Sequence, residues 1–213
     1  MKTDDLVAAL ARSATPVDLR AVRRQFSMTL IVGSVLTVAA MLVFLGPRPD
    51  WRSVIELPMF WMKLAFPAVI AVAAALAVRR LSHPGMRLGG SAAGLAAPVV
   101  LVWLMAALAL SGAPASARAG MLFGASWWQC PLIIAALSVP AFVAAIGAVK
   151  GLAPTRPALT GAVAGLFAGA AAAFAYAFYC VEMQAPFLAV WYVLGMLIPA
   201  GVGALVGLRV LRW

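Results

Sequence analysis

Apolar residues fill this chain in long runs, and only residues 1–26 form a sizeable polar segment. Each of six runs is long enough to cross about 30 Å of hydrocarbon as an α-helix. The runs lie near residues 27–45, 60–78, 89–110, 128–148, 158–180 and 187–208. The pattern predicts an all-α integral membrane protein, with a six-helix transmembrane domain over 27–213 and a short N-terminal tail over 1–26.

Composition agrees with this class. Hydrophobic residues make up 65% of the 213 residues and charged residues only 10%, whereas soluble domains carry about 25% charged residues. The net charge of +10 could indicate nucleic-acid binding, but the basic residues punctuate the apolar runs and form no continuous patch. The bilayer is therefore an expected partner, and direct nucleic-acid binding is not.

Lysine and arginine positions predict the orientation, because cytoplasmic loops carry an excess of them. Three basic residues fall in the predicted outer loops, namely Arg48, Arg52 and Arg118, and Lys63 lies within the second run, where we expect it to snorkel outward. The other twelve fall on the opposite side: Lys2, Arg12, Arg20, Arg23, Arg24, Arg79, Arg80, Arg87, Lys150, Arg156, Arg209 and Arg212. Both termini are predicted to be cytoplasmic.

The tail has two helix-start signals. Thr3 can cap a first short helix with acidic residues in its first turn, and Thr15-Pro16-Val17-Asp18 opens a second. The residues proposed for recognition are Thr3, Asp4, Asp5, Leu6, Val7, Leu10, Val17, Leu19, Arg20 and Arg23. Helices this short are marginal in water. The tail could lie on anionic lipid or fold onto a protein partner. Its early acidic residues do not suit a cleavable signal peptide.

Cys130 and Cys180 are the two cysteines of the chain. Cys130 opens the fourth run within Trp127-Trp128-Gln129-Cys130-Pro131, and Cys180 ends the fifth, so the predicted topology puts both thiols at similar depth on the non-cytoplasmic side. They could be two buried small apolar residues, a disulfide or a ligand pair for a soft metal ion. Glu182 is a candidate third ligand, or alternatively a solvated interfacial charge.

Other side chains in the runs indicate helix packing. Glycines repeat every four residues at Gly161, Gly165 and Gly169, and again at Gly203 and Gly207, which is typical of closely packed membrane helices. Prolines inside four runs should bend their helices or free a carbonyl: Pro67, Pro98, Pro140 and Pro199. Alternatively, the kinked helices give the bundle two accessible arrangements.

The chemistry of the chain argues against catalysis and transport. The sequence has no paired carboxylates, nucleophile–base set or phosphate-binding loop, so no enzyme activity is predicted. The interiors of the runs hold no Asp, Glu or Arg to line an ion path. A membrane thiol-redox protein, a small transporter and a purely structural bundle with a lipid-bound tail remain as alternatives.

The opening Met1-Lys2-Thr3-Asp4-Asp5-Leu6-Val7, the six runs, the Trp-Trp-Gln-Cys-Pro segment and the cysteine ending the fifth run resemble the NrsF-type membrane anti-sigma factors of proteobacteria. The resemblance covers essentially the whole chain. It implies a multi-pass protein of the bacterial inner membrane whose cytoplasmic tail holds an extracytoplasmic-function sigma factor.

The resemblance also implies a role for the cysteines. Cys130 and Cys180 would be a periplasmic sensing pair for metal or oxidative stress, acting in signal transduction and transcription regulation. No resident cofactor is expected, only a transient heavy-metal ion. For release, we expect the fourth and fifth spans to shift against the rest, with Pro140 and the Gly161/Gly165/Gly169 ridge permitting the movement.

Overall fold

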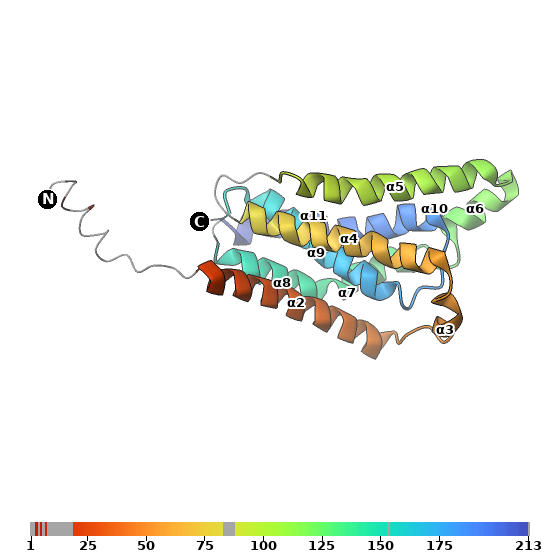
Figure 1. Ribbon diagram of the computed structural model, residues 1–213, viewed down its shortest axis with the longest axis horizontal. Helices are drawn as coiled ribbons and strands as arrows, with labels where there is room; N and C mark the ends of the chain where they lie inside the picture. Colours follow the sequence, from red (N-terminus) through yellow and green to blue (C-terminus); the bar gives the residue numbers. More distant parts are fainter. Residues whose placement is uncertain are drawn as a thin grey trace.

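The structure is a computed structural model that describes residues 3, 5, 7, 19–82, 88–152 and 154–212. Every regular element in these ranges is a helix (Figure 1). In chain order they are α2 (Leu19–Phe44), α3 (Trp51–Val54), α4 (Pro58–Leu81), α5 (Ser91–Gly112), α6 (Ala115–Phe123), α7 (Gln129–Leu137), α8 (Val139–Lys150), α9 (Pro157–Tyr176), α10 (Ala185–Phe187), the π-helical turn η1 (Leu188–Tyr192) and α11 (Val193–Val210). The all-α prediction is confirmed.

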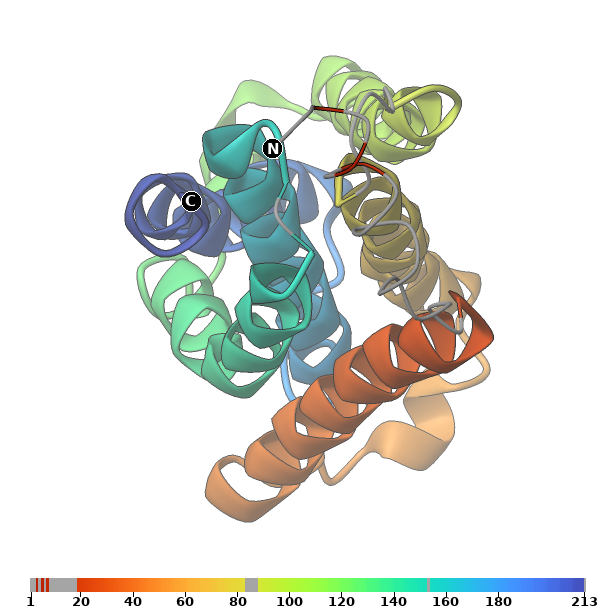
Figure 2. The ribbon, with the colours of Figure 1, turned by 90° about the vertical axis from the view of Figure 1, so that its left-hand side faces the viewer.

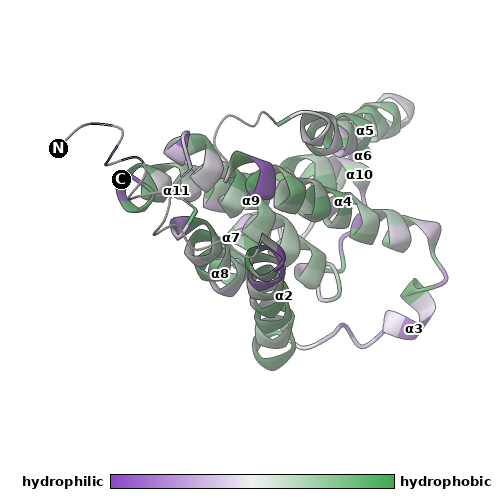
Figure 3. Cartoon of the chain, turned by 60° about the vertical axis from the view of Figure 1, so that its left-hand side comes forward, coloured by the Kyte–Doolittle hydropathy of each residue, from purple (hydrophilic) through white to green (hydrophobic). Residues whose placement is uncertain are grey.

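The number of membrane-length helices agrees with the sequence pattern. In the described ranges α2, α4, α5, α9 and the continuous α10–η1–α11 segment are each long and apolar enough to cross a bilayer, and α7 with α8 makes a sixth if the bent pair is one span. Figure 3 shows the helices apolar along their lengths, with hydrophilic residues gathered near helix ends and at α3. The predicted runs therefore correspond to helices of the bundle.

Helix α9 is the centre of the bundle (Figure 2). Its most extensive partner is α11, followed by α4 and α8. The glycine ridge explains the closeness of α9 and α11: a side chain at Gly165 would collide with the Pro199 carbonyl, and one at Gly161 with the Gly203 carbonyl. Only a residue without a Cβ permits this backbone-on-backbone contact. The packing interpretation of the ridge is confirmed.

The fourth predicted span is broken. Helices α7 and α8 meet at an angle of 44° around Ser138, two residues before Pro140, which has no amide hydrogen to continue the helical hydrogen bonds. The predicted bend at Pro140 is therefore confirmed. The other three prolines, Pro67, Pro98 and Pro199, lie inside continuous helices.

The prediction of a separate second tail helix is wrong. Helix α2 runs without a break from Leu19 to Phe44, so the basic residues Arg20 and Arg23 stand on the first turns of the first spanning helix. The sequence between Leu19 and Phe26 holds no glycine or proline to stop a helix. Phe26 and Leu30 are buried in the core, so packing supports this extension.

The start of α2 and the end of α11 lie at the same end of the bundle (Figure 1). Arg79 and Arg80 in the last turn of α4, and Lys150 in the last turn of α8, belong to this end as well. We call it the basic end. Cys130 near the start of α7 and Cys180 beyond the end of α9 belong to the opposite end, which we call the thiol end.

Candidate functional site

Cys130 is the second residue of α7. Its amide hydrogen donates to the Ser126 carbonyl at 3.0 Å, so the helical hydrogen bonds begin in the preceding turn, and Pro131 is tolerated in the first turn because it needs no donor there. The side chain is 0% exposed. Trp127 packs against Trp191 of η1, with 5.2 Å between ring centroids. The aromatic contact attaches the start of α7 to the last spanning helix.

Cys180 lies outside a helix, contrary to the predicted fifth span over 158–180. Helix α9 ends at Tyr176, and the segment 177–184 that follows is a turn and irregular chain. The Cys180 amide hydrogen still donates to the Tyr176 carbonyl at 2.9 Å, and the side chain is 2% exposed. We call residues 177–184 the thiol segment. Three of its carbonyls, those of Phe178, Cys180 and Glu182, accept hydrogen bonds from residues outside α9.

Two cations bind these carbonyls. Lys63 Nζ donates to the Cys180 carbonyl at 2.6 Å and to the Glu182 carbonyl at 2.7 Å. Arg48 donates its backbone amide hydrogen to the Phe178 carbonyl at 3.1 Å and an Nη1 hydrogen to the Cys180 carbonyl at 3.4 Å. A helix continuing past residue 180 would use the same carbonyls, so these contacts account for its early end.

Lys63 is 0% exposed, so the prediction that it snorkels outward is wrong. Its ammonium group lies 5.5 Å from the centroid of the Tyr192 ring, a distance suited to a cation–π contact. A charge buried this deeply requires hydrogen-bond acceptors, and the two carbonyls of the thiol segment supply them. Lys63 therefore binds the thiol segment and does not turn to solvent.

Arg48 is itself fixed by Asp50. The guanidinium donates to both carboxylate oxygens, at 2.6 Å and 2.7 Å. This pairing lowers the pKa of Asp50 and raises the pKa of Arg48. The ion pair orients Arg48 towards the thiol segment, so the loop before α3 is part of the site.

The two thiols lie in the same part of the core. Both are free, both belong to the same core cluster, and each is an electrostatic neighbour of the other and of the Tyr176 and Tyr192 hydroxyls. The Tyr192 hydroxyl is buried and has no hydrogen-bond partner in the described part of the chain. The thiols therefore lie in one buried cluster with two phenols, and the Lys63 ammonium lies beside the Tyr192 ring.

Glu182 does not complete a metal site in this arrangement. Its carboxylate accepts the Ala125 amide hydrogen at 2.8 Å, beside Gly124, whose φ of 52° favours glycine. Among the described residues no three His, Cys, Asp or Glu side chains come close enough to hold one ion. The thiol pair alone suits a soft, two-coordinate ion rather than the four-ligand geometry of zinc.

The tail residues are placed only in part. Thr3, Asp5 and Val7 are helical and exposed, and Leu19, Arg20 and Arg23 belong to α2. The remaining predicted tail residues lie outside the described residues: Asp4, Leu6, Leu10 and Val17. The structure does not bring the tail residues together with the thiols, which stand at the other end of the bundle.

Sequence reasoning missed the roles of Arg48, Tyr176 and Tyr192. Lys63 could be singled out from the sequence because it is a charged residue within a predicted span. Its hydrogen-bond partners could not, because they are backbone carbonyls, which every residue type carries. Tyr176 is the last residue of α9, and Tyr192 is the last residue of the π-helical turn η1 within the last spanning segment. A search for polar rings at the depth of the cysteines would have found them.

Comparisons with known proteins identify the family of the chain. A family described as negative regulator of sigma F, NrsF, matches residues 10–213. The chain is 44% identical to a probable anti-sigma-F factor NrsF of Azospira oryzae over the full length of both chains. It is 36% identical to the anti-sigma-F factor NrsF of Caulobacter vibrioides, again over the full length of both. No solved structure matches the chain. The sequence resemblance is confirmed, and the chain belongs to the NrsF family of negative regulators of sigma F.

Proposed function

We propose that this protein is an inner-membrane anti-sigma factor that holds an extracytoplasmic-function sigma factor through its N-terminal segment. Full-length similarity to two anti-sigma-F factors carries the proposal. The excess of lysine and arginine at the basic end supports an orientation in which this end faces the cytoplasm. The thiol end then faces the periplasm. Both termini are then cytoplasmic.

The N-terminal segment supplies the contacts with the sigma factor. Exposed Asp5 and Val7 offer a charge for a basic partner surface and an apolar anchor. The first turns of α2 add Arg20 and Arg23. Binding to a membrane-anchored chain keeps the sigma factor away from the chromosome, so transcription of its target genes stays low.

The thiol pair is the sensing element of the proposal. A soft metal ion would displace one proton from each thiol and bind both sulfurs. An oxidant would instead accept two electrons while the two thiols lose two protons and form a disulfide. Metal binding adds a charged ion beside Lys63, and disulfide formation draws the start of α7 towards the thiol segment. Changing the released fraction from about 1% to 99% needs roughly 5.5 kcal/mol of differential free energy.

The signal crosses the bilayer through α7 and α8. Cys130 stands on α7, the bend at Ser138 joins it to α8, and α8 packs along α2. At that contact Gly33 of α2 lies against Ala141 and Ala144 of α8. Because α2 is one helix from Leu19 onward, a shift of α8 displaces the first turns of α2 directly. This refines the expected movement of the fourth and fifth spans.

The test is co-purification of a sigma factor from solubilised membranes. The full chain should retain it, and a variant lacking residues 3–18, which leaves α2 whole, should not. Retention by both forms, or by neither, would contradict the assignment of the partner to the N-terminal segment.

Cysteine variants test the sensor separately. Cys130→Ser and Cys180→Ser should retain the sigma factor in unstressed cells and keep it bound after cadmium or peroxide, whereas the parent releases it. If the variants still release the sigma factor on the same signal, the thiols are not the sensing element.

A further inference from the structure

A cavity of about 350 Å³ lies between α4 and α5 near the thiol end. Its walls are apolar, and Ala185 and Leu188 close it from the side of α10 and η1. Three of the chain's ten methionines line it: Met59, Met62 and Met105. Neither the thiol pair nor the N-terminal segment accounts for this concentration of sulfur.

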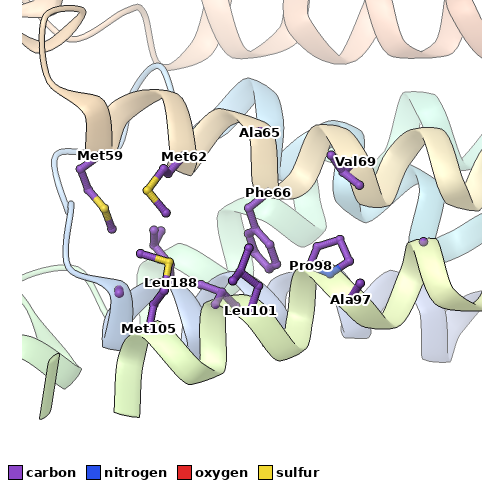
Figure 4. Close-up of a pocket in the computed structure, with 13 residues that line it drawn as sticks. Met59, Met62, Ala65, Phe66, Val69, Ala97, Pro98, Leu101, Met105 and Leu188 are labelled. Atoms are coloured by element: carbon purple, nitrogen blue, oxygen red, sulfur yellow. The ribbon is translucent and has the colours of Figure 1, made fainter. Parts of the chain in front are cut away.

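The three thioethers face one another across the cavity. Met59 and Met62 are three residues apart on α4, so they share one face of the helix, and Met105 comes from α5 opposite. Figure 4 shows their sulfur atoms gathered at one end of the cavity, while Phe66, Pro98 and Leu101 occupy the other end. The arrangement joins two helices that otherwise meet along small and apolar residues.

Methionine often fills irregular gaps in a core, but these three side chains line one end of an open cavity. A thioether is a soft, neutral ligand that selects Cu(I) over hard divalent ions. The apolar walls offer no oxygen ligands to hold Mg²⁺ or Ca²⁺. The chemistry of the cavity therefore suits a soft monovalent cation.

We propose that Met59, Met62 and Met105 form a second metal site, which binds Cu(I) or Ag(I) through three thioethers. The site is distinct from the thiol pair and does not depend on it. Lys63, the residue after Met62, points to the thiol segment, so neighbouring residues of α4 belong to the two sites. Ala185, which lines the cavity, is the residue that follows the thiol segment in the chain. An ion bound in the cavity would therefore lie close to the segment that carries Cys180.

Silver binding to the detergent-solubilised full chain tests the proposal, because Ag(I) needs no reductant. In a Cys130→Ser/Cys180→Ser background, about one equivalent of Ag(I) should remain bound after equilibrium dialysis in chloride-free buffer. Met62→Leu/Met105→Leu should remove it, since losing direct ligands costs more than the about 10-fold to 100-fold lost by mutating a ligand's partner. Leucine conserves volume and leaves the fold intact.

Met196→Leu is the matched control, because Met196 is a buried methionine of α11 that does not line the cavity. It should bind Ag(I) like its parent. Equal Ag(I) binding with and without Met62 and Met105 would overturn the proposal, as would absence of binding in the cysteine-free background while the parent binds. Loss of Ag(I) on adding phospholipid would mean that an acyl chain occupies the cavity instead. These outcomes leave sigma-factor retention untouched, so they are separable from the proposed function.

Discussion

Replacing Lys63 by methionine is the sharpest test of how the thiol segment is held. The substitution keeps the length and the apolar stem of the side chain but removes the ammonium group that donates to the Cys180 and Glu182 carbonyls. Both carbonyls then lose their closest donor. We expect the thiol segment to open more often, while the helices stay packed.

The size of the effect follows from the two bonds. A hydrogen bond to a charged group contributes about 1.5–3 kcal/mol, and the desolvation of the buried ammonium offsets several kcal/mol of the gross sum. Arg48 still reaches the Cys180 carbonyl at 3.4 Å, and the partly buried Glu182 carbonyl can accept from water. The net loss is therefore about 2 kcal/mol, which raises the open population about 30-fold.

Thiol labelling measures this population. Cys180 is 2% exposed, so a maleimide reaches it only when the segment opens, and peptide mass spectrometry separates its labelling from that of Cys130. Lys63→Met should label Cys180 about 30-fold faster than the parent chain. Lys150→Met, the same substitution at an exposed position of the basic end, should label at the parent rate. Equal rates in all three chains would refute the role assigned to the Lys63 hydrogen bonds.

Two further predictions concern stability in detergent. Gly165→Ala should lower the thermal unfolding midpoint because its Cβ would collide with the Pro199 carbonyl. Gly147→Ala, with open space around it, should leave the midpoint unchanged or raise it, because alanine stabilises a helix interior by up to about 1 kcal/mol over glycine. Equal midpoints for the two variants would contradict the backbone contact. The Arg48–Asp50 pair lowers the pKa of Asp50, so its contribution is complete above the unfolded-state pKa of about 4 and is lost as pH falls through the lower folded-state pKa. Asp50→Asn should remove this acid-side loss in midpoints measured from pH 7 to pH 3, and an unchanged profile would show that the pair does not stabilise the fold.

The main features of the fold were predictable because they rest on periodic signals. Runs of apolar residues specify the helices, and the glycine spacing on the fifth run predicts close helix packing, which the structure shows between α9 and α11. The cysteines could be brought together from topology alone, since an antiparallel pair of spans places the start of one beside the end of the next.

The features that escaped prediction depend on tertiary packing. The end of α9 at Tyr176 is determined by cations that arrive from Lys63 and Arg48, far away in the chain. The extension of α2 to Leu19 depends on the burial of Phe26 and Leu30. Lys63 lies near the start of a helix, where a lysine side chain can either reach outward or be buried. It is buried here because the Cys180 and Glu182 carbonyls accept its hydrogen bonds.

The burial of Lys63 also constrains how the protein is made. Its acceptors lie 117 and 119 residues later in the chain. At about 5–20 residues per second, ribosomes need roughly 6–24 s to synthesise that stretch. Until then the ammonium must be solvated at the membrane interface, where a long side chain near a helix end can reach water. The first spans therefore insert with Lys63 turned outward, and the chain withdraws it only when the fifth span delivers the thiol segment.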